Sequence, residues 1–156
     1  MKIVRAPLRV TLGGGGTDLP GWYTLHGGYL ITATIDKYIY ITGSDRLYDR
    51  KIWLSYSKVE ICDSLDDVKH ELYAECLKEF DLHQGYEFHS ISELPGNTGL
   101  GSSGAFLVAL IKLLSEMRPR PMTSHDIAEL ACEMEMIRSK EGIPLHEEVV
   151  DWFKDI

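Results

Sequence analysis

At 156 residues, the chain is long enough for one domain with a hydrophobic core and too short for two comfortable ones. The net charge of −8 argues against nucleic acid as a partner, because surfaces that bind nucleic acid are usually basic. No apolar run approaches the roughly 18 residues that would cross a bilayer, so we expect no membrane association. The three cysteines are widely spaced and form no CxxC pair, which favours a reducing compartment, and we expect the cytoplasm.

The first part of the chain is predicted to form strands. Residues 3–5 and 8–12 alternate apolar and polar side chains, as half-buried strands do. The run YLITATIDKYIYIT (29–42) is rich in β-branched and aromatic residues. It is long enough for one bent strand, or for two strands that meet near Asp36. The segment KIWLS (51–55) is a further short strand.

The second part is predicted to be mainly helical. Apolar residues recur mostly at spacings of three and four over residues 64–80 and 127–137. Residues 105–114 are apolar almost all round, which indicates a buried helix. Thr123 and Asp126 are spaced like a capping box, which marks the start of the helix that follows them.

Two further elements complete the prediction. Residues 86–91 alternate like a strand, and residues 146–153 form a last amphipathic helix. Strands therefore dominate the front of the chain and helices the back. This order favours an α+β fold over a regularly alternating parallel sheet.

One glycine run, PGNTGLGSSG, precedes the buried helix. Residues 99–104 fit the GxGxxG of a dinucleotide fold, but no second strand is predicted after the helix, as that fold requires. Residues 96–103 fit a phosphate loop, except that Ser102 stands where the motif has lysine. Backbone amides at a helix start bind anions without a lysine. An anion site is one interpretation, and a turn that only caps the helix is the other.

A second glycine run lies in RVTLGGGGTDLPGWY, after a predicted strand. Four consecutive glycines cost about 0.5–1 kcal/mol each relative to alanine, which suggests close backbone approach to a ligand. The Asp18 carboxylate can accept hydrogen bonds from hydroxyls, Arg9 supplies a fixed positive charge, and Trp22 and Tyr23 offer an apolar wall. This mixture suits a polyol or a sugar. A flexible hairpin is the alternative.

These two segments resemble the signature motifs of the GHMP kinases. The segment P-x-x-x-G-L-G-S-S, Pro95 to Ser103, resembles the ATP-binding motif of that family, and Arg5 to Asp18 is similar to its first motif. The sequence GGGTD followed by LPGWY resembles the sugar branch, especially the D-glycero-D-manno-heptose 7-phosphate kinases and fucokinase-like enzymes. The resemblance implies a GHMP kinase N-terminal, ATP-binding domain over 1–138, similar to the second domain of ribosomal protein S5. It leaves 139–156 as a divergent C-terminal helical tail.

The resemblance also implies roles for individual residues. Arg9 would be catalytic and would steady the charge of the transition state, and Ser103 and Glu135 would hold Mg²⁺. A sugar or sugar phosphate would bind at Gly15, Gly16, Thr17 and Asp18. The triphosphate of ATP would lie along Pro95, Gly96, Gly99, Leu100, Gly101, Ser102, Ser103 and Gly104.

The implied activity is ATP-dependent phosphoryl transfer to a sugar hydroxyl, on a heptose-phosphate-like substrate. The chain departs from the family after Glu135, where SKEGIPLHEEVVDWFKDI replaces a GKQDQY-like stretch that carries the catalytic aspartate. The family's C-terminal domain is absent as well. We therefore expect a truncated half with weak or no activity alone, which a complementing C-terminal half would complete. The alternative is a non-catalytic remnant that binds nucleotide or assembles as a homo-oligomer.

Overall fold

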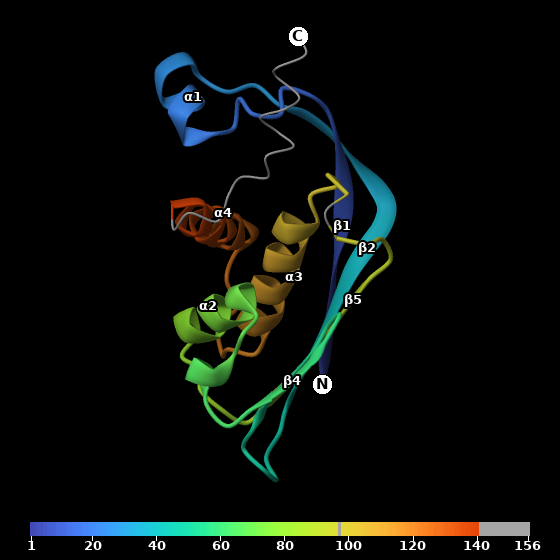
Figure 1. The fold of residues 1–156 in the computed structure, drawn as a ribbon, viewed down its shortest axis with the longest axis vertical. Helices are drawn as coiled ribbons and strands as arrows, with labels where there is room; N and C mark the ends of the chain where they lie inside the picture. The colour runs from blue at the N-terminus through green and yellow to red at the C-terminus, as the bar shows by residue number, and fades with distance from the viewer. Residues whose placement is uncertain (97, 141–156) are drawn as a thin grey trace.

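The computed structural model describes residues 1–96 and 98–140. Five strands form one sheet in the order β1-β2-β5-β3-β4, and the helical layer covers one face of it (Figure 1). Neighbouring strands are antiparallel except for β5 and β3, which are parallel. This arrangement confirms the expected α+β fold. The strands are β1 (Lys2–Gly13), β2 (Ile31–Asp45), β3 (Ile52–Ser55), β4 (Val59–Cys62) and β5 (Tyr86–Ser92).

The predicted helices that fall within the described residues appear in the expected order, and a further short helix, α1, lies near the start of the chain. A short α1 precedes β2, a single 3₁₀ turn and α2 precede β5, and α3 and α4 come last, with no strand between them. The missing strand after α3 removes the dinucleotide interpretation of the glycine run. The bounds are α1 (Pro20–His26), η1 (Leu65–Asp67), α2 (Glu71–Glu79), α3 (Ser102–Glu116) and α4 (Ser124–Lys140).

The strands β1 and β2 form a long antiparallel ribbon with an interruption in its register. Pro7 pairs with Tyr38, but Arg9 pairs with Thr34, so residues 35–37 of β2 lie opposite the single residue Leu8. Such a bulge bends a strand and increases its twist. The run 29–42 is therefore one bent strand, with its irregularity at the predicted place.

Helix α3 is the centre of the core. Its side chains Leu107, Leu110 and Leu114 are fully buried, and each such burial contributes about 1.5–3 kcal/mol. Gly43 of β2 lets this helix approach the sheet, because a Cβ atom there would lie 2.8 Å from Cδ2 of Leu113. Tight packing of α3 on the sheet fixes the position of its N-terminus, where the glycine run ends.

The predicted helix over 64–80 begins later than expected. The turn Leu65–Asp67 is 3₁₀, and α2 starts only at Glu71, after His70. The physical reason lies in the preceding β3–β4 hairpin. There the side chain of Glu60 accepts a hydrogen bond of 2.8 Å from the N–H of Lys69. This contact diverts the backbone from a continuous helix.

Two elements were not predicted from the sequence. Strand β4 has four residues and pairs with β3, and α1 has seven residues, which is too short for a helical period to show. The only local signal for α1 is Pro20 in its first turn, a position that proline favours. The segment after the second glycine run is therefore a helix and not only a hairpin.

The predicted capping box at the start of α4 is confirmed. Asp126 Oδ2 accepts a hydrogen bond of 3.0 Å from the N–H of Thr123, and the N–H of Asp126 donates to Thr123 Oγ1 at 3.2 Å. The expected helix 146–153 lies outside the described residues, as does most of the tail 139–156. None of the helices in the described part of the chain has the length and apolar character needed to cross a membrane.

Candidate functional site

The first glycine run leads directly into α3 and leaves the start of this helix open. Gly99 and Gly101 have φ angles of 70° and 68°, a conformation that other residues adopt only with strain. Gly101 is the N-cap residue, and no side-chain hydrogen bond caps the helix within the described residues. The first amides of a helix have no partners within it, and the helix dipole is positive at this end. The loop therefore presents backbone donors suited to an anion.

This loop is anchored at both ends. At its start, the carboxylate of Glu93 accepts a hydrogen bond of 2.8 Å from the N–H of Tyr38 and pairs with Lys37 Nζ at 3.4 Å. Both partners lie in or next to the bulge of β2. At its end, the carbonyl oxygen of Leu100 accepts a hydrogen bond of 3.1 Å from the N–H of Arg9. The loop therefore spans from β2 to the free edge of β1.

The structure brings together the two residues expected to hold a metal ion. Ser103 Oγ donates to Glu135 Oε1 at 2.9 Å, although the two residues are 32 positions apart. A Cβ atom at Gly104 would lie 3.7 Å from both carboxylate oxygens of Glu135, so this glycine admits the carboxylate to the first turn of α3. Two oxygen ligands at right angles around Mg²⁺ at about 2.1 Å lie roughly 3 Å apart. The pair fits this ion.

Arg9 lies against the same loop. A Cβ atom at Gly101 would be 3.0 Å from both Cγ and Nε of Arg9, so the arginine side chain packs directly on the N-cap glycine. Its Nη1 atom donates to Thr11 Oγ1 at 3.3 Å. A guanidinium group carries a permanent charge and is suited to bind phosphate oxygens. The expected catalytic arginine thus lies beside the expected phosphate loop.

The second glycine run is held closely by its own hydrogen bonds. The hydroxyl of Thr17 donates to the carbonyl oxygens of Gly14 at 2.7 Å and Tyr29 at 2.9 Å, and accepts from the N–H of Tyr29 at 3.0 Å. Asp18 Oδ1 accepts a hydrogen bond of 3.0 Å from the N–H of Gly16. These contacts favour a fixed loop over a flexible hairpin. The sugar contacts expected of this loop stay predictions.

The two glycine runs meet on one segment of β1. Arg9 packs on the first run, and Thr11 lies beside the second, where a Cβ atom at Gly15 would be 3.5 Å from Thr11 Cγ2. The hydrogen bond between Arg9 and Thr11 shows that both side chains extend on the same side of the strand. Alternate residues of a strand lie about 6.6 Å apart. This spacing suits a phosphoryl donor at one run and its acceptor at the other.

Three contributors to the site were not identified from the sequence. Thr11 bonds Arg9 and lies beside the second run, and Glu93 anchors the first run to β2. The carbonyl oxygen of Tyr29 accepts a hydrogen bond from the hydroxyl of Thr17. Thr11 had a usable signal, because side chains two apart on a strand share a face, and Arg9 was already singled out. Glu93 and Tyr29 act through contacts that only the fold brings about.

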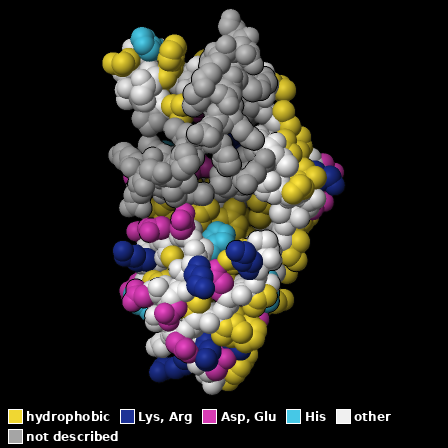
Figure 2. Space-filling model, in the orientation of Figure 1, with side chains coloured by type: hydrophobic (Ala, Val, Ile, Leu, Met, Phe, Trp, Pro, Cys, Tyr) yellow, Lys and Arg dark blue, Asp and Glu magenta, His cyan; other side chains and the backbone are white. Residues whose placement is uncertain are grey.

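Several large apolar side chains around α1 are exposed, and Figure 2 shows apolar atoms at the end of the molecule that holds this helix. We call residues 12–31 the arm. It includes α1 and exposes an unusual number of large apolar residues. Their exposed fractions are 68% for Leu12, 78% for Leu25, 79% for Tyr29 and 54% for Ile31. Exposed apolar clusters of this kind usually mark an interaction surface.

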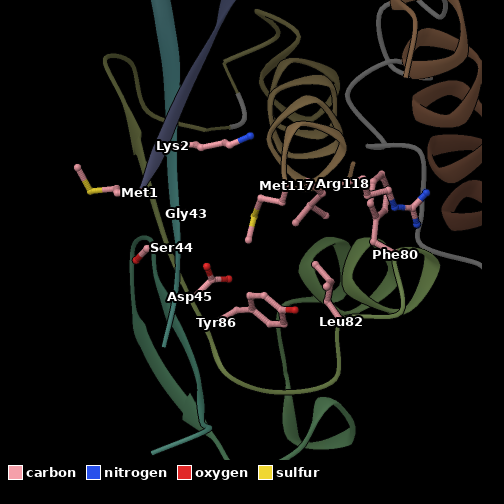
Figure 3. A pocket seen from close by; sticks show the side chains of 11 residues that line it. Met1, Lys2, Gly43, Ser44, Asp45, Phe80, Leu82, Tyr86, Met117 and Arg118 are labelled. Atoms are coloured by element: carbon pink, nitrogen blue, oxygen red, sulfur yellow. The ribbon is translucent and has the colours of Figure 1, made fainter. Parts of the chain in front are cut away.

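A cavity of about 210 Å³ lies at the other end of α3, far from the glycine runs (Figure 3). Two cations line it, and both contact helix ends. Lys2 Nζ donates to the carbonyl oxygen of Glu116, and Arg118 Nη2 donates to that of Glu79 at 3.4 Å while its guanidinium stacks on Phe80. Cations at the C-termini of helices stabilise them. We therefore assign this cavity a structural role.

Comparison with known proteins agrees with these observations. Residues 68–144 match the model of the GHMP kinases N terminal domain. The chain is 32% identical over 148 residues to the D-glycero-alpha-D-manno-heptose 7-phosphate kinase of Campylobacter jejuni. The matched region covers 86% of this chain and 44% of that enzyme.

Solved structures show the same fold. The D-glycero-D-manno-heptose 1-phosphate kinase of Bacteroides thetaiotaomicron matches with a TM-score of 0.75 and 24% identity, over 91% of this chain and 49% of that one. The galactokinase of Lactococcus lactis, solved with galactose, matches with a TM-score of 0.68 and 21% identity, over 92% and 39%. This chain spans about half the length of such relatives or less. With its two glycine motifs and this fold, the chain matches the N-terminal domain of the GHMP kinase family.

Proposed function

We propose that this chain is the ATP-binding half of a sugar kinase that transfers a phosphoryl group to a heptose-phosphate-like substrate. The observation that carries the proposal is the contact between Ser103 and Glu135 at the uncapped start of α3. This contact places a carboxylate and a hydroxyl, both suitable metal ligands, next to the backbone amides at the N-terminus of the helix. Phosphoryl transfer needs mainly positioning and neutralisation of charge, which such a site supplies.

Each residue then has a defined task. The amides of residues 99–104 bind the phosphate oxygens of ATP, and Ser103 and Glu135 hold Mg²⁺, which when bound neutralises phosphate charge. Arg9 stabilises the charge that develops on the transferred group. Asp18 uses Oδ1 for the N–H of Gly16, which leaves Oδ2 to accept a hydrogen bond from a sugar hydroxyl.

We further propose that turnover requires a second half of the kinase, and that this half covers the arm. The relatives are about twice as long as the matched region, and the arm exposes apolar residues beside the acceptor loop. A second copy of this chain on the same surface is the competing assembly, and it corresponds to the non-catalytic remnant. Light scattering of the purified chain distinguishes them. A monomer that a separately supplied second half converts to a stable complex supports the proposal, and a self-associated oligomer supports the remnant.

Calorimetric titration with MgATP tests the nucleotide site. We expect saturable binding that Ser103→Ala and Gly101→Val both weaken, the first by removing the metal ligand and the second by straining the loop and displacing Arg9. Ser124→Ala, at the exposed start of α4, is the matched control and should bind as the wild type does. Absence of binding by a folded chain would overturn the proposal. Transfer from radiolabelled ATP to heptose 7-phosphate, with and without the second half, then tests the reaction.

A further inference from the structure

Thr11 contacts the second glycine run and the arginine that packs on the first. Its hydroxyl accepts the 3.3 Å hydrogen bond from Nη1 of Arg9, and its methyl group lies beside Gly15. The side chain is exposed, so burial in the core does not demand a threonine here. Its cross-strand neighbour Thr32 is exposed too, but has no side-chain hydrogen bond within the described residues. Of these two paired threonines, Thr11 has the specific contact.

The chemistry of threonine suits the task of orienting an arginine. A β-branched side chain has a restricted χ1 angle, so a methyl group that packs on Gly15 also fixes the direction of the hydroxyl. An arginine side chain has several rotatable bonds, and its guanidinium group occupies one place only when contacts confine it. Gly101 confines Arg9 on one side and Thr11 on the other.

We propose that Thr11 is a positioning residue, which holds the guanidinium of Arg9 between the phosphate loop and the acceptor loop. The inference rests on the proposed function, since that function gives Arg9 its charge-stabilising role. Thr11 acts through Arg9 and is not required to touch the nucleotide. It also links the loops, because its methyl group lies beside Gly15 and its hydroxyl bonds the arginine that packs on Gly101.

The test compares two changes at this position. Thr11→Val keeps the branched shape and removes the hydroxyl, whereas Thr11→Ser keeps the hydroxyl. Thr32→Val is the matched control on the opposite strand. The guanidinium N–H signals of Arg9 are recorded by nitrogen-15 NMR of the folded chain and are assigned by their loss in Arg9→Lys. This readout needs no catalytic activity.

We expect Thr11→Val to speed hydrogen exchange of the Arg9 guanidinium about threefold to tenfold, the range expected when one hydrogen bond to a charged group is lost at an exposed site. Thr11→Ser, which keeps the hydroxyl but loses the methyl group, should raise the exchange rate less than Thr11→Val does, and Thr32→Val should leave it close to that of the wild type. Where the wild type transfers phosphate, alone or with the second half, Thr11→Val should lower kcat by a similar factor while the KM for MgATP changes less than about twofold.

Unchanged Arg9 signals in Thr11→Val, or an equal change in Thr32→Val, would overturn the proposal whether or not the chain binds MgATP. Altered signals with an unchanged kcat would also overturn it, because Arg9 would then not need to be held. A wild-type chain that binds no MgATP would instead contradict the proposed function. The two failures are therefore distinguishable.

Discussion

The two glycine runs use the same residue for different physical reasons. In the run that enters α3, Gly96 and Gly99 have open space where a Cβ atom would lie, and Gly99 and Gly101 have positive φ angles. In the run that follows β1, a Cβ atom at Gly14 would lie 1.9 Å from the carbonyl oxygen of Tyr29. At Gly96 and Gly99 glycine leaves an open surface, whereas at Gly14 it permits close backbone packing.

This difference suits the ligand that we propose for each loop. The run before α3 is anchored by Glu93 and by the carbonyl of Leu100, and within it Thr98 Oγ1 donates to the carbonyl oxygen of Pro95 at 3.2 Å. The run after β1 is held in its middle by Thr17, which places Asp18 on a rigid turn. Preorganised donors suit a phosphate, and a rigid carboxylate suits the oriented hydroxyl of a sugar.

The largest expected effect comes from Gly14→Ala. The added methyl group would overlap the backbone of Tyr29 at a φ angle of 81°, so we expect a loss of about 3 kcal/mol or more in the free energy of unfolding. Urea unfolding measures it. Gly13→Ala, next in the chain and with nothing within 4 Å of the added atom, should change stability by less than about 0.5 kcal/mol. Equal effects at the two positions would remove the distinction between packed and open glycines.

Thr17→Val should have the next largest effect. It keeps the shape of the side chain but removes the hydroxyl that bonds Gly14 and Tyr29, and we expect a loss of about 2 kcal/mol. Hydrogen exchange should rise at the N–H of Tyr29 and stay unchanged in residues 99–104. A loss of protection in both loops would mean that they do not act as separate units.

A smaller effect is expected for Gly99→Ala in the open run. The left-handed conformation costs a residue with a Cβ atom about 1 kcal/mol, with no clash to add to it. We expect this loss in urea unfolding together with weaker binding of MgATP. Gly96→Ala, which has open space and no positive φ angle, should be neutral for stability. A loss at Gly99 as large as that at Gly14 would show that the open run is packed after all.

The smallest expected effect is on the pH dependence of stability, through Glu87 in the sheet. The pKa of Glu87 is lowered by its hydrogen bonds to His89 and Arg46, and the pKa of Asp49 is lowered chiefly by its hydrogen bond to Arg46. A lowered folded-state pKa gives stability that is present above the unfolded pKa of about 4 and is lost as the pH falls through the folded value. We expect the stability difference between the wild type and Glu87→Gln to shrink between pH 7 and pH 3. A difference independent of pH would contradict this assignment.

Much of the fold was predictable because its signals are local. The β-branched and aromatic residues of 29–42 predicted β2, as one bent strand or two strands that meet near Asp36, and the capping box at Thr123 marked the start of α4. Strand β4 and helix α1 were missed because four and seven residues are too few to establish a period. The delayed start of α2 depends on Glu60, a tertiary contact that no local pattern contains.

The site was predictable in its parts more than in its assembly. The glycine runs and Arg9 stand out in the sequence, but the pairing of Ser103 with Glu135 followed only from the family resemblance. The role of Thr11 depends on two loops reaching the same segment of β1, which requires the register of the ribbon and the packing of α3.

The most direct test is nitrogen-15 NMR of the labelled chain during addition of MgADP, followed by heptose 7-phosphate. We expect MgADP to shift the amide signals of residues 99–104 and of Glu135, and to leave those of residues 14–17 in place. The sugar phosphate should then shift the signals around Asp18. Shifts from MgADP in residues 14–17 alone, or none in a folded chain, would contradict the assignment of phosphate binding to the run before α3.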